Sequence, residues 1–163
     1  TFDEVLTAYQ LQDADGEVVV EDTIETSYVP AGKTVYDTIT YDNYSYDVDA
    51  SKSIAMVAGV GHQPGAKYGN TKLNISYEDE MTVNDYGTSI AEITVKYKNE
   101  YKDYVKGWVF VFIYDTDQNL VDVKTHMIFL KGKALETETF NIYDYDENYG
   151  GCEVKYATFY KTY

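Results

Sequence analysis

The sequence contains no arginine: its 13 cationic side chains are all lysines, set against 28 aspartates and glutamates, and the formal net charge is −15. An acidic surface repels phosphate groups, and without arginine the chain lacks the bidentate donor that usually contacts guanine and phosphate. The composition therefore argues against nucleic-acid binding and against anionic membrane surfaces. Cationic partners and divalent metals stay compatible with it.

Cysteine, proline and long apolar runs are also scarce. Cys152 is the one cysteine, so no disulfide can form within the chain. No apolar run reaches the ~18 residues of a membrane-spanning helix, which predicts no direct membrane insertion. The chain opens at Thr1 rather than at a methionine, and we expect a processed or trimmed piece of a longer protein.

Aromatic and β-branched residues are abundant instead. Aromatics make up 16% of the chain, with 19 tyrosines, and apolar residues make up 44%. Such side chains suit the half-buried surface of a pleated strand, and this apolar fraction can fill a packed core. No long segment has apolar residues at helical spacing. The composition predicts an all-β fold.

One pattern occurs twice. Residues 9–19 (YQLQDADGEVV) and 111–121 (VFIYDTDQNLV) each show an alternating apolar strand, a D-x-D sequence and a second apolar strand, at an offset of 102. TITY at 38–41 then matches TETF at 137–140, so the offset drifts to 99. A repeat of this length predicts the tandem duplication of one β-module. We expect two tandem immunoglobulin-like β-sandwich modules.

The second module, residues 72–163, is predicted to be complete. In Ser89–Tyr97 the alternation predicts that Ala91, Ile93, Val95 and Tyr97 form the buried face. A series of short strands in ~90 residues is typical of an immunoglobulin-like sandwich. The expected strands are Leu73–Tyr77, Met81–Val83, Ser89–Tyr97, Trp108–Tyr114, Leu120–Phe129, Leu135–Tyr143 and Glu153–Tyr160. Trp108–Tyr114 is apolar on both faces, which predicts a central strand.

The first module, residues 1–63, is predicted to be partial, with 64–71 as a linker. Leu6 aligns with Trp108, so counterparts of 73–97 are missing. A half-sandwich would expose unpaired strand edges, so we expect something to complete it: a segment that precedes Thr1, a neighbouring molecule or a strand from residues 65–90.

We therefore expect Phe2–Gln12 to lie beside a strand from outside residues 1–63. That strand would come from residues 65–90 or from another molecule. The second case predicts a strand-mediated dimer through the incomplete first module.

Short motifs resemble the FxLYD family of extracytoplasmic bacterial modules. VFIYD at 111–115 and YQLQD at 9–13 match the end of that family's anchor strand, and VKYKNE at 95–100 resembles its V-x-N segment. Val111 stands where the family has an aromatic residue, and Gln12 where it has tyrosine. The resemblance implies a β-sandwich on a Gram-positive cell surface or lipoprotein, with no catalytic residues to carry over.

Calcium is one candidate ligand. Asp115, Asp117 and Asn119 have the D-x-D-x-N spacing that begins a calcium-binding loop, and Asp13 and Asp15 repeat the two acids. Neither loop has the closing acid that such a site needs. Between two strands the same residues are also ordinary turn formers, and we favour the turn. No other cofactor is expected.

Tyrosine-rich loops are the second candidate site. The tyrosines that recur near one loop in both copies are Tyr41, Tyr44, Tyr46, Tyr143 and Tyr145. Tyrosine offers a rigid amphipathic surface to sugars or proteins, although on a strand it also packs with its hydroxyl in water.

No catalytic constellation is evident, because neither histidine, His62 or His126, is placed by a motif beside a nucleophile. Taken with the Gram-positive cell-surface location that the resemblance implies, the sequence predicts a non-enzymatic module that spaces, adheres or binds a protein or glycan partner. A carbohydrate- or calcium-binding module using the Tyr/Asp loops is the alternative.

Overall fold

The protein is all-β in a computed structural model that describes residues 2–29, 31–32, 34–39, 47–62, 67–70, 73–83, 85–87, 89–143 and 149–162. Across these ranges the chain forms three sheets and no helix, and so has no helix that could cross a membrane. The strands are β1 (Phe2–Gln12), β2 (Val18–Val29), β3 (Ile54–Gly61), β4 (Lys67–Asn70), β5 (Leu73–Val83), β6 (Ser89–Asn99), β7 (Val105–Asp115), β8 (Leu120–Leu130), β9 (Leu135–Tyr143) and β10 (Tyr149–Thr162).

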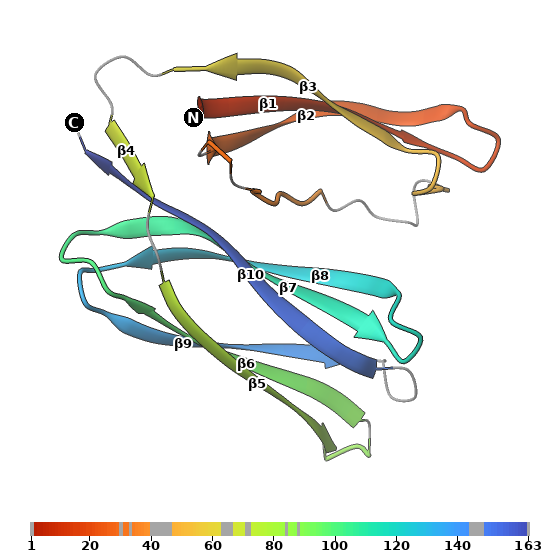
Figure 1. Cartoon of the computed structure of the whole chain (residues 1–163). Coiled ribbons are helices and arrows are strands. Elements are labelled where there is room, and N and C mark those ends of the chain that lie inside the picture. The colour runs from red at the N-terminus through yellow and green to blue at the C-terminus, as the bar shows by residue number, and fades with distance from the viewer. Residues whose placement is uncertain are drawn as a thin grey trace. The chain divides into compact units, whose positions relative to one another are not determined.

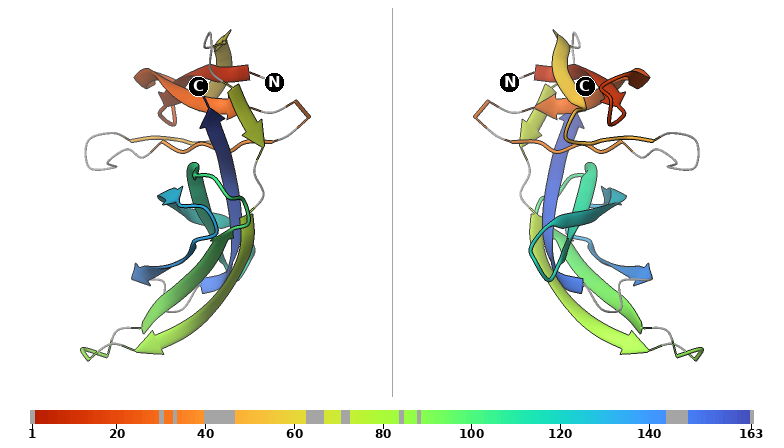
Figure 2. Two further views of the ribbon diagram at one scale, coloured as in Figure 1. Left: turned by 90° about the vertical axis from the view of Figure 1, so that its left-hand side faces the viewer. Right: turned by 90° about the vertical axis from the view of Figure 1, so that its right-hand side faces the viewer.

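The chain divides into two compact units, 1–68 and 69–162. Unit 1 holds one sheet with the strand order β2-β1-β3. Unit 2 holds two sheets, one with the order β4-β10-β7-β8 and the other with the order β5-β6-β9 (Figures 1 and 2). The short strand β4 contains the division point, and nothing in the sequence pattern predicted it.

The core of unit 2 lies between its two sheets. The four residues predicted to be buried on β6, Ala91, Ile93, Val95 and Tyr97, are at most 1% exposed, which confirms the alternation. They pack against a matching set on β7, whose members are 0% exposed: Val105, Val109, Val111 and Ile113. Interleaved aliphatic side chains from two facing sheets are the usual core of a β-sandwich.

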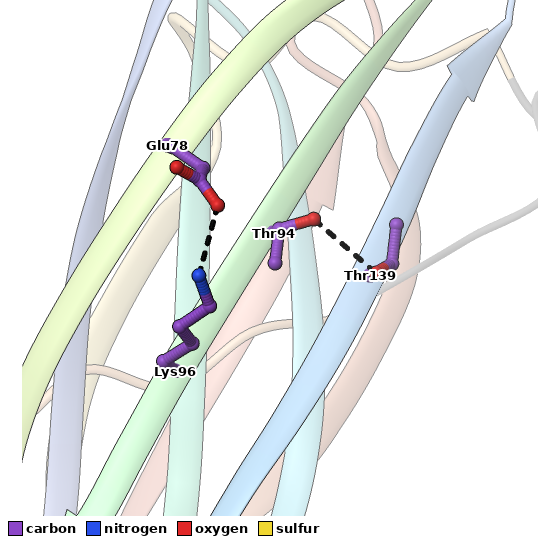
Figure 3. Close-up of polar contacts among 4 residues, drawn as sticks. All are labelled: Glu78, Thr94, Lys96 and Thr139. Carbon is purple, nitrogen blue, oxygen red and sulfur yellow. Dashed lines mark hydrogen bonds and ion pairs between the residues drawn. The ribbon is translucent and has the colours of Figure 1, made fainter.

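The opposite face of the β5-β6-β9 sheet is polar. Lys96 Nζ lies 3.0 Å from a Glu78 carboxylate oxygen, and the hydroxyls of Thr94 and Thr139 lie 3.3 Å apart across the next pair of strands (Figure 3). These cross-strand pairs are exposed, so each adds little stability. They show that this sheet has a core side and a water side.

Most predicted strands of the second module are confirmed within a few residues at each end. β7 is hydrogen-bonded on both sides, by β8 and β10, as predicted for a central strand. Two predictions were wrong in detail. β5 continues from Leu73 to Val83 without a break, because it pairs with β6 along its whole length. Residues 149–151, expected in a loop, begin β10.

The two units share one strand register. Leu6 on β1 pairs with Glu25 on β2, and the residues 102 positions later, Trp108 and Met127, pair in the same way. The correspondence holds for every pair from Glu4 to Gln12, including a bulge at the end of the strand. The sheet β2-β1-β3 therefore repeats β8-β7-β10 strand for strand.

The third strand of each sheet follows the drifted offset. Tyr9 pairs with Ala55 in unit 1, and Val111 pairs with Val154 in unit 2. The central strands are 102 residues apart, and their partners are 99 apart from Ile54 to Val57 and 98 apart beyond a bulge that only unit 1 has, between Leu6 and Thr7. The sequence repeat shows the same change of offset, so the residues that it aligns occupy equivalent positions in the two sheets.

The prediction that Phe2–Gln12 lies beside a strand from outside residues 1–63 was wrong. Both edges of β1 are occupied from within that range, by β2 and by β3. The reason lies in unit 2, where the opening strands β5 and β6 belong to the opposite sheet. The strands β5 and β6 pair with β9 in that sheet, and neither pairs with an edge of the β4-β10-β7-β8 sheet.

Unit 1 has no second sheet among its described residues. Residues 34–39, which correspond by sequence offset to the start of β9, belong to no strand. Their partner in a complete module is β6, and the described part of unit 1 has no counterpart of it. Of the side chains described in unit 1, only Tyr9 and Tyr28 are buried, at 5% and 7% exposure.

Candidate functional site

Asn99 anchors one end of the unit 2 sandwich. Its side chain is 0% exposed, and its amide nitrogen donates hydrogen bonds to the carbonyls of Asp103 (2.8 Å), Lys131 (3.0 Å) and Leu130 (3.3 Å). Its side-chain oxygen accepts a hydrogen bond of 2.9 Å from the backbone N–H of Tyr101. A buried amide must satisfy its polar atoms in this way. Asn99 thereby fixes the loop between β6 and β7.

A glycine lets a second loop approach the first. A Cβ at Gly132 would stand 1.9 Å from the carbonyl oxygen of Lys102. The two loops are also joined by hydrogen bonds from Lys133, whose backbone N–H donates to the Tyr101 carbonyl at 3.0 Å and whose Nζ donates to the Glu100 carbonyl. The backbone carbonyls of Glu100 and Tyr101 therefore both accept hydrogen bonds from Lys133.

These two residues line a groove of about 790 Å³ in unit 2. The groove lies along the edge of the sandwich where β5 and β10 meet, and its volume falls in the range of small-ligand sites. The lining residues are Leu73, Asn74, Ile75, Tyr77, Glu100, Tyr101, Val154 and Tyr156. Because Val154 and Ile75 pack on the core, the floor of the groove is apolar.

Three tyrosines and one carboxylate give the groove its chemistry. Tyr77 and Tyr101 are 43% and 36% exposed, whereas Tyr156 is half-buried against the core. The Glu100 carboxylate lies 3.0 Å from Nζ of Lys98. Tyrosine rings with hydroxyl groups beside polar acceptors suit a sugar or an extended peptide, because both present an apolar face and hydrogen-bonding groups.

The predicted Asp residues of the D-x-D sequences form hairpin turns. The Asp13 carboxylate accepts hydrogen bonds from the backbone N–H groups of Asp15 (3.0 Å) and Glu17 (2.9 Å). In unit 2 the Asp115 carboxylate accepts from the backbone N–H of Asn119 at 2.8 Å and from its amide at 3.0 Å. The Asn119 amide lowers the pKa of Asp115 as the largest cause.

The two turns also share backbone geometry. Gly16 and Gln118 occupy the same position and have positive φ angles of 87° and 66°. Each donates its backbone N–H to the carbonyl of the first Asp at 3.0 Å. Asx-type bonding of this kind is ordinary turn chemistry. No group of three His, Cys, Asp or Glu side chains that could hold a metal occurs among the described residues, and calcium binding by Asp117 and its neighbours stays a prediction.

Most of the tyrosines predicted from the loop repeat cannot be placed. Tyr41, Tyr44, Tyr46 and Tyr145 lie outside the described residues, and Tyr143 ends β9 with no side-chain description. The groove tyrosines were not singled out from the sequence, because they are separated by 24 and 55 positions along the chain. A strand pattern shows which face each occupies, and only sheet pairing brings them together.

Cys152, His126 and Tyr149 do not line this groove. Burial raises the pKa of the Cys152 thiol, which disfavours the thiolate. His126 faces the core side of β8, with Nδ1 3.8 Å from the Glu138 carboxylate and its ring edge-on to Phe140. Tyr149, half-buried, donates a hydrogen bond of 2.8 Å to Asp79, and burial is the main cause of its raised pKa.

Comparison with known proteins provides no relative for this site. The chain matches no family model, no curated protein and no solved structure. Its function therefore has to be inferred from the sheets, the groove and their residues.

Proposed function

We propose that the chain is a pair of related immunoglobulin-like β-sandwich modules of FxLYD type that serves as a non-catalytic spacer or partner-binding segment on a Gram-positive cell surface. The observation that carries this proposal is the shared register of β1-β2-β3 and β7-β8-β10 at offsets of 102 and 99. Tandem repetition of one β-module is a common way to build extended surface proteins, because each unit adds length and contact area.

The buried Asn99 adds support to the family resemblance. It is the asparagine of the VKYKNE segment, and its four hydrogen bonds explain why such a module would need that residue at the end of its second strand. Charge is consistent with export to a solvent-exposed location, since a net charge of −15 favours solubility.

The groove supports binding rather than hydrolysis. Glycosidases normally use two carboxylates, about 5 Å or about 6.5–9.5 Å apart, on either side of the bond that breaks. The described lining of the groove contains one carboxylate, that of Glu100, and it already has Lys98 as an ionic partner. Glycoside hydrolysis would require a second carboxylate close to Glu100.

Surface labelling tests the leading proposal. Antibodies raised against the chain should label intact cells of the source organism, because a surface module is accessible without lysis. Labelling that appears only after the cells are broken would contradict the proposed location. A membrane-impermeant biotin reagent, which would modify lysines such as exposed Lys96, gives an independent measurement on the same cells.

A second candidate function is saccharide binding in the groove, favoured by Tyr77, Tyr101 and Tyr156. On a glycan array, or with purified cell-wall sacculi, the wild-type chain should bind saturably and Tyr77→Ala should bind at least about fivefold more weakly, since one stacked ring contributes ~1 kcal/mol or more. Tyr104→Ala is the matched control, because Tyr104 is 57% exposed and does not line the groove. Equal binding by all three proteins would rule out the groove as a saccharide site.

A further inference from the structure

The first long strand of the unit 2 sandwich has an open edge. β5 pairs with β6 along its whole length, from Leu73 to Val83, and it stands at the end of the sheet order β5-β6-β9 (Figures 1 and 2). No strand among the described residues pairs with its other side. Another strand can add to a long edge of this kind, because half of the backbone N–H and C=O groups point outward.

The core side of β5 is exposed as well. Tyr77 is 43% exposed and Met81 is 47% exposed, whereas Val95 and Ala91, the residues opposite them on β6, are at most 1% exposed. The facing sheet therefore covers β6 at these positions and leaves β5 open. Tyr77 also lines the groove of about 790 Å³ described above. A strand added beside β5 would bring its own inward side chains against Tyr77 and Met81.

The outer side of the same strand carries an unfavourable pair of charges. Glu80 on β5 lies directly opposite Glu92 on β6. The Cβ atoms of directly opposite residues are about 5 Å apart, and like charges at that spacing repel each other. Glu78 has a partner in Lys96 (Figure 3), but no described cation forms an ion pair with Glu80 or Glu92. A local rule broken in this way is expected at a functional site.

We propose that the open edge of β5 binds an extended segment of a partner protein in which basic and apolar residues alternate. Its lysine or arginine side chains would lie on the outer side beside Glu80 and Glu92, and its apolar side chains would lie against Tyr77 and Met81. Backbone pairing with β5 would supply affinity, and the alternating side chains would supply specificity. This names the partner in the partner-binding role proposed above, and it rests on that role.

Charge selects this occupant over the others that could reach the edge. The three consecutive acids Glu78, Asp79 and Glu80 repel an acidic strand, and a second copy of the chain brings its own net charge of −15. The three longest segments of this chain outside the described structure, residues 40–46, 63–66 and 144–148, contain no lysine. None of them can supply the basic side chains.

An alternating lysine–valine octapeptide provides the probe. The peptide is labelled with a fluorophore and titrated with the full chain, and binding is followed by fluorescence anisotropy. We expect saturable binding with one peptide per chain, weakened by added salt. A lysine–glycine octapeptide has the same charge without the apolar side chains, so it should bind at least about fivefold more weakly.

Glu80→Lys separates a loss of binding from a loss of folding. The introduced lysine would face Glu92 and repel the basic peptide, so binding should weaken by at least about fivefold. Removal of the like-charge pair should at the same time raise the melting temperature, followed by Trp108 fluorescence, by about 1–3 °C. A variant that bound weakly because it was misfolded would melt at a lower temperature.

Glu25→Lys is the matched control. It changes the net charge by the same amount and replaces an exposed acid on β2, which is also an edge strand. Glu25 lies opposite Leu6, so this position has no pair of like charges. Peptide binding by Glu25→Lys should stay within about twofold of the wild type.

Four results would overturn the proposal. The first is no saturable binding of the lysine–valine peptide at about millimolar concentration. The second is equal weakening of binding in Glu80→Lys and Glu25→Lys, which would mean that net charge alone attracts the peptide. The third is equal binding of the lysine–valine and lysine–glycine peptides. The fourth is a rise in melting temperature with calcium chloride that Glu80→Lys abolishes while no peptide binds, which would assign the acid pair to a cation.

The surface-labelling experiment separates failure of this proposal from failure of the proposed function. If intact cells are labelled and the peptide does not bind, only the strand-addition proposal falls. If labelling requires broken cells, the proposed surface function falls, whatever the affinity for the peptide.

Discussion

Replacement of Asn99 by alanine should destabilise unit 2 more than any other single polar substitution in its described core. Asn99 is the one buried polar or charged residue among those described, and its side chain links the end of β6 to three carbonyls and one N–H group on two loops. Truncation of this side chain to a methyl group leaves these backbone groups without their hydrogen-bond partner. Water cannot take the place of the lost amide inside the sandwich.

The expected loss is about 3–5 kcal/mol. The two amide hydrogens are shared among three carbonyls, so the four contacts of the side chain count as about three hydrogen bonds, each contributing about 1 kcal/mol net. The buried carbonyl of Leu130 adds the cost of an unsatisfied group, ~1–3 kcal/mol, and water reaching the exposed Asp103 offsets about 1 kcal/mol of the total. With a urea m-value of roughly 2 kcal/mol per molar, the midpoint should fall by about 1.5–2.5 M.

Equilibrium unfolding in urea measures this loss. Trp108 is the one tryptophan and lies on β7, so its fluorescence reports on unit 2. Asn141→Ala is the control, because Asn141 is exposed on β9 and its loss should change the free energy of unfolding by less than about 0.5 kcal/mol. A loss below about 1 kcal/mol for Asn99→Ala, or equal losses for the two variants, would refute the role given to Asn99.

Three further predictions concern unit 2. Gly132→Ala should lower the melting temperature more than Gly87→Ala in calorimetry. A Cβ at Gly132 would meet a backbone oxygen at 1.9 Å, whereas Gly87 faces open space with a φ of +80°. Equal shifts of the melting temperature would contradict the close approach. Burial, with smaller effects of Glu138 and Glu136, raises the pKa of Tyr97 to about 12 from 10.0. The neutral phenol therefore stabilises the fold below pH 10, and this contribution is lost as pH rises towards 12, so urea midpoints should fall less steeply over that window in Tyr97→Phe. The pKa of Asp115 is lowered chiefly by Asn119, so its ionised form stabilises the turn above the unfolded-state pKa near about 3.9, and this is lost on acidification. Stability should fall less steeply below about pH 4 in Asp115→Asn than in Asp117→Asn. Identical dependence of stability on pH in the two variants would contradict the role given to the Asp115 turn.

Local pattern was enough to place most strands and turns of the second module. Alternation in Ser89–Tyr97 identified the buried set because the side-chain period of a strand is two, and this depends only on neighbours along the chain. The D-x-D turns could be predicted because Asp side chains accept hydrogen bonds from backbone N–H groups a few residues on, and Gly adopts positive φ. The groove did not follow, because Tyr77, Tyr101 and Tyr156 meet through pairings that span the module.

The sequence by itself determined the all-β class, the strand alternation, the hairpin turns and the repeat at offsets of 102 and 99. These properties depend on local periodicity and on comparison of one part of the chain with another. Tertiary structure alone decided which sheet each strand joins. It showed that β1 takes both neighbours from residues 1–63, and that β5 and β6 of unit 2 join a different sheet from β7. Strand pairing is long-range, and the period-two pattern of a strand shows which face is buried without showing what buries it.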